Sequence, residues 1–349
     1  MMATIFFLSS GLFLGWSLGA NNAANFFGTA VGTKMIKFRT AAIFCGIFVI
    51  LGAVISGAGT ADTLSKLGAI DTLPGAFVIA LASAITSYFM TRAGLPISTS
   101  QAIIGGIVGW NLYTLTPTDT VSLYNIVGTW IFSPVLTAIM AYLLYHIFKR
   151  IIDRANIHLL LLDKYTRIGL LLAGVFGSYS LGANNIGNVV GIFMNSSPFR
   201  DITIGGIWHI SSVQQLFLLG GLAIAVGVFT YSKKVMLTVG SGIYKLSPVT
   251  ALIVVISVSI TLFLFASRGL HEFLVSCHLP AFPLVPVSSS QAVIGAVMGI
   301  SFAKGARNLR WGKIVQISLG WVITPVLSAV LSYFSLFFME NVFLQSVIK

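Results

Sequence analysis

The chain has 349 residues, of which 56% are hydrophobic and only 8% are charged, and its net charge is +12. Soluble domains carry roughly 25% charged residues, so this composition, with a mean hydropathy of +0.96, excludes a soluble fold. The two cysteines, Cys45 and Cys277, form no metal-ligand pattern. Most of the chain is therefore expected to lie in a lipid bilayer.

Apolar stretches long enough to cross a membrane recur along the chain, and each crossing needs about 20 residues. The first and sixth stretches contain polar phrases, so we expect broken helices there. The sequence predicts ten segments, at 3–33, 39–59, 74–91, 94–111, 121–148, 166–194, 207–230, 247–266, 283–302 and 313–338. The expected fold class is an all-α polytopic membrane protein.

The positive charge indicates orientation rather than binding to nucleic acid. Sixteen of the twenty Lys and Arg residues can be placed on one side of the membrane, including the run from Lys149 to Arg167. Lys66, Arg200, Arg268 and Lys349 fall on the other side. Because Lys and Arg collect in cytoplasmic loops, we predict a multi-pass protein of the cell membrane with both termini outside.

Three motifs occur twice in the same order. Ser17–Asn25 matches Ser180–Asn188, and Pro96–Gly105 matches Pro286–Gly295. The last segment of each half shares a Trp, a Pro-Val-Leu phrase and a Tyr. With five crossings in each half, the second half enters the membrane upside down, which is typical of transporters whose substrate site lies near the midplane.

We therefore predict two inverted-topology repeats with broken helices or hairpins at the midplane. Their bounds are 1–148 and 168–349, and a basic cytoplasmic linker spans 149–167. Such an arrangement would bring the duplicated motifs of the two halves together.

The Pro-x-Ser-x-Ser-Gln motif suits the start of a helix, because proline is tolerated only there. The free N–H groups of a first helical turn bind anions, and hydroxyl and amide groups would add further donors. Two such starts could grip a tetrahedral anion from both faces. The alternative is that the Ser residues are ordinary N-caps. The residues concerned are Ser98, Thr99, Ser100, Gln101, Ser288, Ser289, Ser290 and Gln291.

The Gly-Ala-Asn-Asn-x-x-Asn motif offers amide groups at membrane depth. Gly19 and Gly182 permit a helix break or a close approach of helices. Asn carbonyls could bind a small cation such as Na⁺, and Asn N–H groups could donate to an anion. The alternative is a packing role, since small residues and Asn join membrane helices.

Together the two motifs resemble those of the inorganic phosphate transporter (PiT) family, over the whole chain. The resemblance implies a membrane symporter for phosphate that is driven by Na⁺ or H⁺, built from inverted repeats and frequently dimeric. It implies an anion site at Asn25, Ser98, Thr99, Ser100, Gln101, Asn188, Ser288, Ser289, Ser290 and Gln291. It implies a cation site at Asn22 and Asn185 with their neighbours Asn21 and Asn184.

One departure affects the expected substrate and coupling ion. The family phrase usually reads Gly-Ala-Asn-Asp, whereas this chain has Asn22 and Asn185 at the acidic position. A site without these carboxylates holds a cation less strongly and could favour sulfate. The alternatives to a phosphate symporter are thus a sulfate or related oxyanion permease, or a passive anion channel. The serines show no spacing with a base that supports an enzyme, and no cofactor other than Na⁺ is expected.

Overall fold

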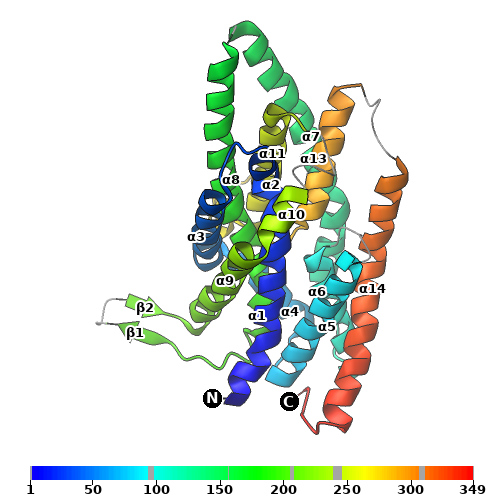
Figure 1. Ribbon diagram of the computed structural model, residues 1–349. Helices are drawn as coiled ribbons and strands as arrows, with labels where there is room; N and C mark the ends of the chain where they lie inside the picture. The colour runs from blue at the N-terminus through cyan, green and yellow to red at the C-terminus, as the bar shows by residue number, and fades with distance from the viewer. Residues whose placement is uncertain are drawn as a thin grey trace.

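The computed structural model describes residues 2–92, 98–155, 157–204, 208–238, 246–305 and 311–348. The first half contains helices α1 to α7, and the second half contains α8 to α14 with one short hairpin (Figure 1). The bounds are α1 Met2–Asn22, α2 Ala24–Gly32, α3 Phe38–Ser56, α4 Ala58–Gly68, α5 Leu73–Arg92, α6 Thr99–Thr114, α7 Thr120–Ala155, α8 Leu159–Val190, a 3-10 turn Gly191–Phe193, β1 Ile202–Ile204, β2 Trp208–Ile210, α9 Ser212–Thr230, α10 Ser232–Thr238, α11 Pro248–Ala266, α12 Arg268–Ser276, α13 Ser289–Ala303 and α14 Trp311–Asn341.

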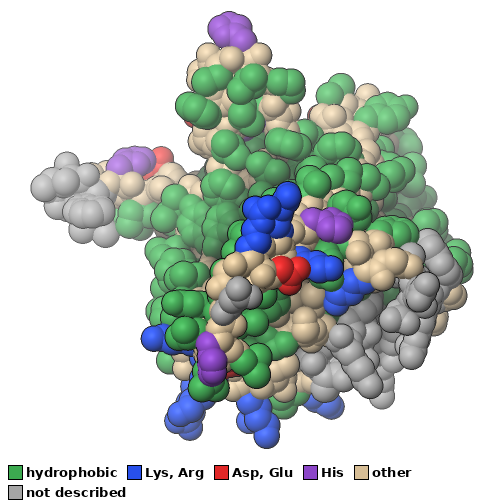
Figure 2. Space-filling model, turned by 90° about the horizontal axis from the view of Figure 1, so that it is seen from above, with side chains coloured by type: hydrophobic (Ala, Val, Ile, Leu, Met, Phe, Trp, Pro, Cys, Tyr) green, Lys and Arg blue, Asp and Glu red, His purple; other side chains and the backbone are tan. Residues whose placement is uncertain are grey.

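The structure confirms a helical membrane protein. In the described ranges, six helices are long and apolar enough to cross a bilayer: Phe38–Ser56, Leu73–Met90, Thr120–Ala155, Ser212–Thr230, Pro248–Ala266 and Ile314–Asn341. Hydrophobic side chains are spread widely over the described surface when the molecule is seen from above (Figure 2). Both chain termini lie at one end of the molecule and the turn between α7 and α8 at the other (Figure 1), which is the relation between termini and central turn that the charge pattern predicts.

Two predicted spans are shorter than the sequence suggests. Helix α6 has 16 residues and α13 has 15, and at 1.5 Å per residue neither alone crosses a core about 30 Å thick. Residues Leu279 to Val287, which precede α13, are not helical. Residues 94–97, which begin the predicted segment 94–111 and include Pro96, lie outside the described residues. The count of five crossings per half therefore stays a prediction.

The central basic segment is mostly helical. Helix α7 extends through Ala155 and α8 starts at Leu159, so the predicted linker at 149–167 consists of helix extensions around a short turn. His158 caps α8, since its Nδ1 accepts from the Leu160 N–H at 3.3 Å. The cytoplasmic position of this segment stays a prediction.

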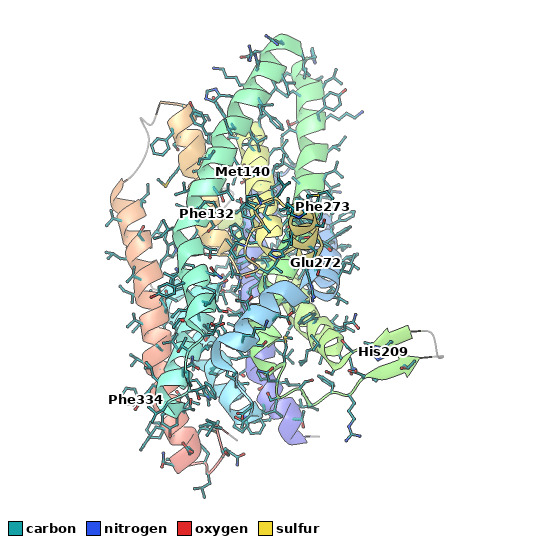
Figure 3. The ribbon with its side chains drawn as sticks, turned by 180° about the vertical axis from the view of Figure 1, so that it is seen from behind. Phe132, Met140, His209, Glu272, Phe273 and Phe334 are labelled. Atoms are coloured by element: carbon teal, nitrogen blue, oxygen red, sulfur yellow. The ribbon has the colours of Figure 1, made fainter. Side chains whose placement is uncertain are left out.

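The start of the predicted helix 207–230 is a strand instead. Trp208–Ile210 pairs antiparallel with Ile202–Ile204, and α9 begins after a capping box between Ser211 and Gln214. His209 lies on this hairpin, outside the helical body (Figure 3). Alternating β-branched and aromatic residues favour strands, and the capping box fixes where the helix begins.

The two halves interlock through matching contacts. Helix α1 packs against α9, and α8 packs against α3. A Cβ added at Gly19 would lie 1.9 Å from the Ile224 carbonyl oxygen, and one at Gly182 would lie 2.0 Å from that of Val49. Glycine at these two equivalent positions is therefore required for close helix approach, which is one of the two roles that the sequence allows. No larger residue fits without moving a backbone.

Equivalent side chains also bond across these contacts. The Trp16 indole Nε1–H donates to Thr230 Oγ1 at 2.9 Å. At the matching place, the hydroxyls of Ser56 and Tyr179 are 2.6 Å apart. Trp16 and Tyr179 each precede the Ser of the duplicated Asn motif. The same kind of tie thus occurs once for each half.

The short helices exchange partners between halves as well. Helix α6 packs against α14, and α13 packs against α7. The proline inside each long helix faces a glycine of the short one, Pro325 facing Gly105 and Pro134 facing Gly295. In Figure 1, α13 lies toward the α7–α8 turn and α6 toward the chain termini. Two inverted halves predict this exchange, although the inversion itself stays a prediction.

We predict that Gly182→Ala destabilises the fold, because the new methyl group meets the backbone of Val49. Overpacking of this kind costs about 1–3 kcal/mol, so the Tm in detergent should fall by several degrees. Gly128→Ala is the control, since nothing lies within 4 Å of its Cβ position. An equal Tm for both variants would contradict close packing of α8 on α3.

Candidate functional site

The two Ser-Gln motifs begin helices in the same way. Ser98 is the N-cap of α6, and its Oγ accepts from the Gln101 N–H at 3.3 Å. Ser288 is the N-cap of α13, and its Oγ accepts from the Gln291 N–H at 3.3 Å. The capping role that the sequence allowed is therefore real for one Ser in each motif. The other hydroxyls of each motif lie in the first helical turn, where N–H groups are unpaired and the helix dipole is positive.

Each Asn motif contacts the Ser-Gln motif of the other half. The Asn25 Nδ2–H donates to Ser289 Oγ at 3.1 Å. The Asn188 Nδ2–H donates to Ser100 Oγ at 2.8 Å and to Asn185 Oδ1 at 3.0 Å. The structure thus brings all four motifs into one neighbourhood. Asn25, Asn188, Ser100 and Ser289 are the predicted anion-site residues in direct contact.

The remaining hydroxyls of the motifs lie beside these contacts. Ser288 and Ser290 have their Oγ atoms 3.0 Å apart. Thr99 and Ser290 are half-buried, whereas Ser98, Ser100, Ser288 and Ser289 are buried. Each helix start therefore has one hydroxyl residue that is less buried than its neighbours.

The two glutamines carry buried acceptor atoms. Gln101 and Gln291 are each only 1% exposed. Within the described residues, Gln101 Oε1, Gln291 Oε1 and Asn188 Oδ1 have no hydrogen-bond partner. A buried acceptor without a donor is destabilising. These three oxygens therefore suit a ligand that brings a hydrogen.

The Asn motifs differ in backbone and in burial. Helix α1 ends at Asn22 and α2 begins at Ala24, so the first copy is broken at the motif as expected. Helix α8 runs unbroken through its motif and ends at Val190, which corrects the broken helix expected for the second copy. Asn184, Asn185 and Asn188 are fully buried, whereas Asn21, Asn22 and Asn25 are half-buried.

The four asparagines predicted for a cation have different partners. Asn21 Nδ2–H donates to the Ser17 carbonyl at 3.1 Å, and Asn185 Nδ2–H donates to the Leu181 carbonyl at 3.1 Å. Asn184 bonds to the backbone of Val287. Asn22 lies at the C-terminal end of α1. Among the described residues, no three His, Cys, Asp or Glu side chains group together, so a cation here would rely on neutral oxygens.

A model of the phosphate transporter family matches residues 18–272 and 279–348. The chain belongs to this family. The family consists of transporters rather than enzymes, so the chain is a multi-pass membrane transport protein of the phosphate transporter family.

Individual relatives cover nearly the whole chain. A protein of Methanocaldococcus jannaschii that carries the provisional name of phosphate permease is 26% identical over 90% of this chain and 91% of its own. The sulfate permease CysP of Bacillus subtilis is 28% identical over 92% of this chain and 84% of its own. A solved structure named as the sodium-dependent phosphate transporter has a TM-score of 0.76 at 22% identity, over 98% of this chain and 100% of the other. This last likeness shows the fold.

The bond between Asn188 and Ser100 can be tested by a double-mutant cycle. Asn188→Ala and Ser100→Ala should each lower the Tm in detergent, because each removes a buried hydrogen bond of about 1 kcal/mol. Together they should lower it by clearly less than the sum, since the two residues contact each other. Asn188→Ala with Thr230→Ala is the matched pair, because Thr230 bonds Trp16 elsewhere. Additive shifts in both pairs would contradict the contact.

Proposed function

We propose that the protein is a secondary active transporter that carries inorganic phosphate together with Na⁺ or H⁺. The observation that carries this proposal is the pairing of each Asn motif with the helix start of the other half. A site built from both halves can change its exposure when the halves move relative to each other, as coupled transport requires.

The site's chemistry suits an oxyanion. The first turns of α6 and α13 supply N–H groups and partial positive charge. Hydroxyls of Thr99, Ser100, Ser289 and Ser290 add donors that can rotate toward an oxygen. None of these groups carries a full charge, so the ligand is held by directed hydrogen bonds.

The unpartnered acceptors favour phosphate over sulfate. In the orientation that the structure gives their amides, Gln101 Oε1, Gln291 Oε1 and Asn188 Oδ1 need a donor. Phosphate at neutral pH still carries one or two hydroxyl hydrogens, which can pair with one or two of these oxygens. Sulfate carries none, so it would leave the three oxygens unpaired and lose binding energy.

Sulfate is the second candidate. The acidic position of the family phrase is Asn22 in one half and Asn185 in the other. A site with no carboxylate does not repel a dianion such as sulfate, and it offers no strong base to accept a proton from phosphate. The relative CysP, named as a sulfate permease, supports this alternative.

The coupling ion and the orientation belong to the same proposal. Na⁺ would be held by amide oxygens near Asn21, Asn22 and Asn185, with backbone carbonyls nearby. The name of the structural neighbour supports Na⁺ as the driving ion, and the charge pattern supports both termini outside the cell membrane. We further propose a homodimer in the lipid bilayer.

Uptake into proteoliposomes tests the substrate. Labelled phosphate should enter with saturable kinetics, and unlabelled sulfate should compete at least tenfold less well, because it cannot fill the acceptors. Liposomes without protein are the control. Saturable sulfate entry that phosphate does not inhibit would show that the substrate is sulfate and not phosphate.

Imposed gradients test the coupling. An inward Na⁺ or H⁺ gradient should drive phosphate above its external concentration. The same vesicles with an ionophore that collapses the gradient should reach only equilibrium. Uptake that follows the membrane potential and never exceeds equilibrium would indicate a passive channel.

A further inference from the structure

The strap from Leu279 to Val287 leads into α13 without helical structure. Such a segment needs other elements to satisfy its backbone. The Thr63 hydroxyl of α4 donates to the Leu284 carbonyl, and the Val285 N–H donates to the Phe265 carbonyl of α11 at 3.2 Å. Pro286 has no N–H. Val287 is the last residue before Ser288, the N-cap of α13. Because Pro286 has no N–H to be held by, the bonds of Val287 determine where α13 begins.

Asn184 binds both backbone groups of Val287. Its Nδ2–H donates to the Val287 carbonyl at 2.7 Å, and its Oδ1 accepts from the Val287 N–H at 2.9 Å. Asn184 and Val287 are both 0% exposed. The planar amide thus acts toward Val287 as a neighbouring strand would, with one donor and one acceptor. The next residue, Ser288, caps α13.

The face of α8 that carries Asn184 also contacts the start of α6. Asn184 and Asn188 are four residues apart on α8, so their side chains lie one above the other on one face. Asn188 donates to Ser100 in the first turn of α6 at 2.8 Å. One turn of α8 therefore contacts the start of α13 through Asn184 and the start of α6 through Asn188.

We propose that Asn184 is a positioning residue for the anion site and is not a ligand of the coupling cation. In this role Asn184 fixes the first turn of α13 (the α13 tip) relative to the first turn of α6 (the α6 tip). This inference rests on the proposed oxyanion function of the two tips. Because α8 is unbroken through the motif, the spacing of the tips follows from the rigid spacing of two side chains on it. Loss of Asn184 would loosen the start of α13, which would keep only its bond from Asn25 to Ser289, while the bond from Asn188 would still hold the start of α6.

A cation role makes a different demand on the same residue. As a cation ligand, Asn184 would need its Oδ1 directed at the ion, and its removal would weaken the ion's apparent affinity. As a positioning residue, its removal would weaken the anion's apparent affinity, and the ion's apparent affinity measured at saturating phosphate would stay unchanged. The two roles are therefore separated by which concentration dependence shifts.

The experiment compares the wild type, Asn184→Ala and Asn184→Asp, with Ser178→Ala as control. Ser178 is a buried α8 residue whose hydroxyl bonds the Gly174 carbonyl within its own helix. Initial uptake of phosphate is measured in proteoliposomes over a range of phosphate and Na⁺ concentrations. Asn184→Ala should raise the KM for phosphate about tenfold, as expected for losing a buried hydrogen-bonded clamp, with the half-saturating Na⁺ concentration unchanged and Ser178→Ala like the wild type.

Asn184→Asp refines the result at a pH high enough to ionise the introduced carboxyl group, because the carboxylate can still accept from the Val287 N–H but cannot donate to the carbonyl. Asn184→Asp should therefore raise the KM for phosphate, as Asn184→Ala does. A cation ligand would instead gain affinity for Na⁺ from this added charge. An unchanged phosphate KM in Asn184→Ala, or a shifted Na⁺ dependence in either variant, would overturn the proposal.

Hydrogen exchange gives a readout that needs no transport. In purified wild-type protein, the amide of Val287 should be protected, and Asn184→Ala should speed its exchange by at least tenfold while the α3 amides stay protected. Equal protection in both proteins would overturn the clamp, whatever the substrate is. If the wild type carries sulfate and not phosphate, the proposed function fails, and the same KM comparison with sulfate still decides the role of Asn184.

Discussion

A polar site in a membrane must satisfy its own hydrogen bonds, because lipid offers neither donors nor acceptors. In this protein neither half can do so alone. The Asn25 amide depends on Ser289, and the Asn188 amide depends on Ser100. The first turns of α6 and α13 are therefore each tied to an Asn side chain of the other half, and the start of α13 is also held by Asn184 of its own half. The close glycine contacts serve this arrangement, since only a short distance between helices lets short Asn and Ser side chains meet.

The sequence indicated which residues lie together better than it indicated the backbone that carries them. Duplicated motifs indicated that Asn25, Asn188 and the serines belong together, and the residue type at Gly19 and Gly182 allowed the close approach that the structure shows. The partner of Asn184 could not be predicted, because it is the backbone of a residue 103 positions away. Every type of residue except proline has the same backbone N–H and carbonyl groups, so the sequence does not mark this one. Helix α8 stays unbroken because its polar residues find partners in neighbouring elements, whereas hydropathy registers only their polarity.

The lengths of the elements show a similar limit. An apolar run does not tell whether its residues form one span or a short helix with an extended strap, and α13 with Leu279–Val287 is the second case. The strap is held by bonds to Thr63, Phe265, Asn184 and His271, which come from four other helices. The hairpin of Trp208–Ile210 likewise depends on pairing with residues 202–204. Such tertiary partners override local preference.

The unequal burial of the two Asn motifs bears on how a substrate could pass through. Asn184, Asn185 and Asn188 are sealed, while Asn21, Asn22 and Asn25 are half-buried. The two halves make equivalent hydrogen bonds, Trp16 with Thr230 and Tyr179 with Ser56. If the halves exchanged conformations, the first Asn motif would be buried and the second half-buried, and the same kinds of contact would be kept. The molecule would then have two conformers of similar energy, each open on one side, and a small free-energy input from a co-transported ion would suffice to move it between them.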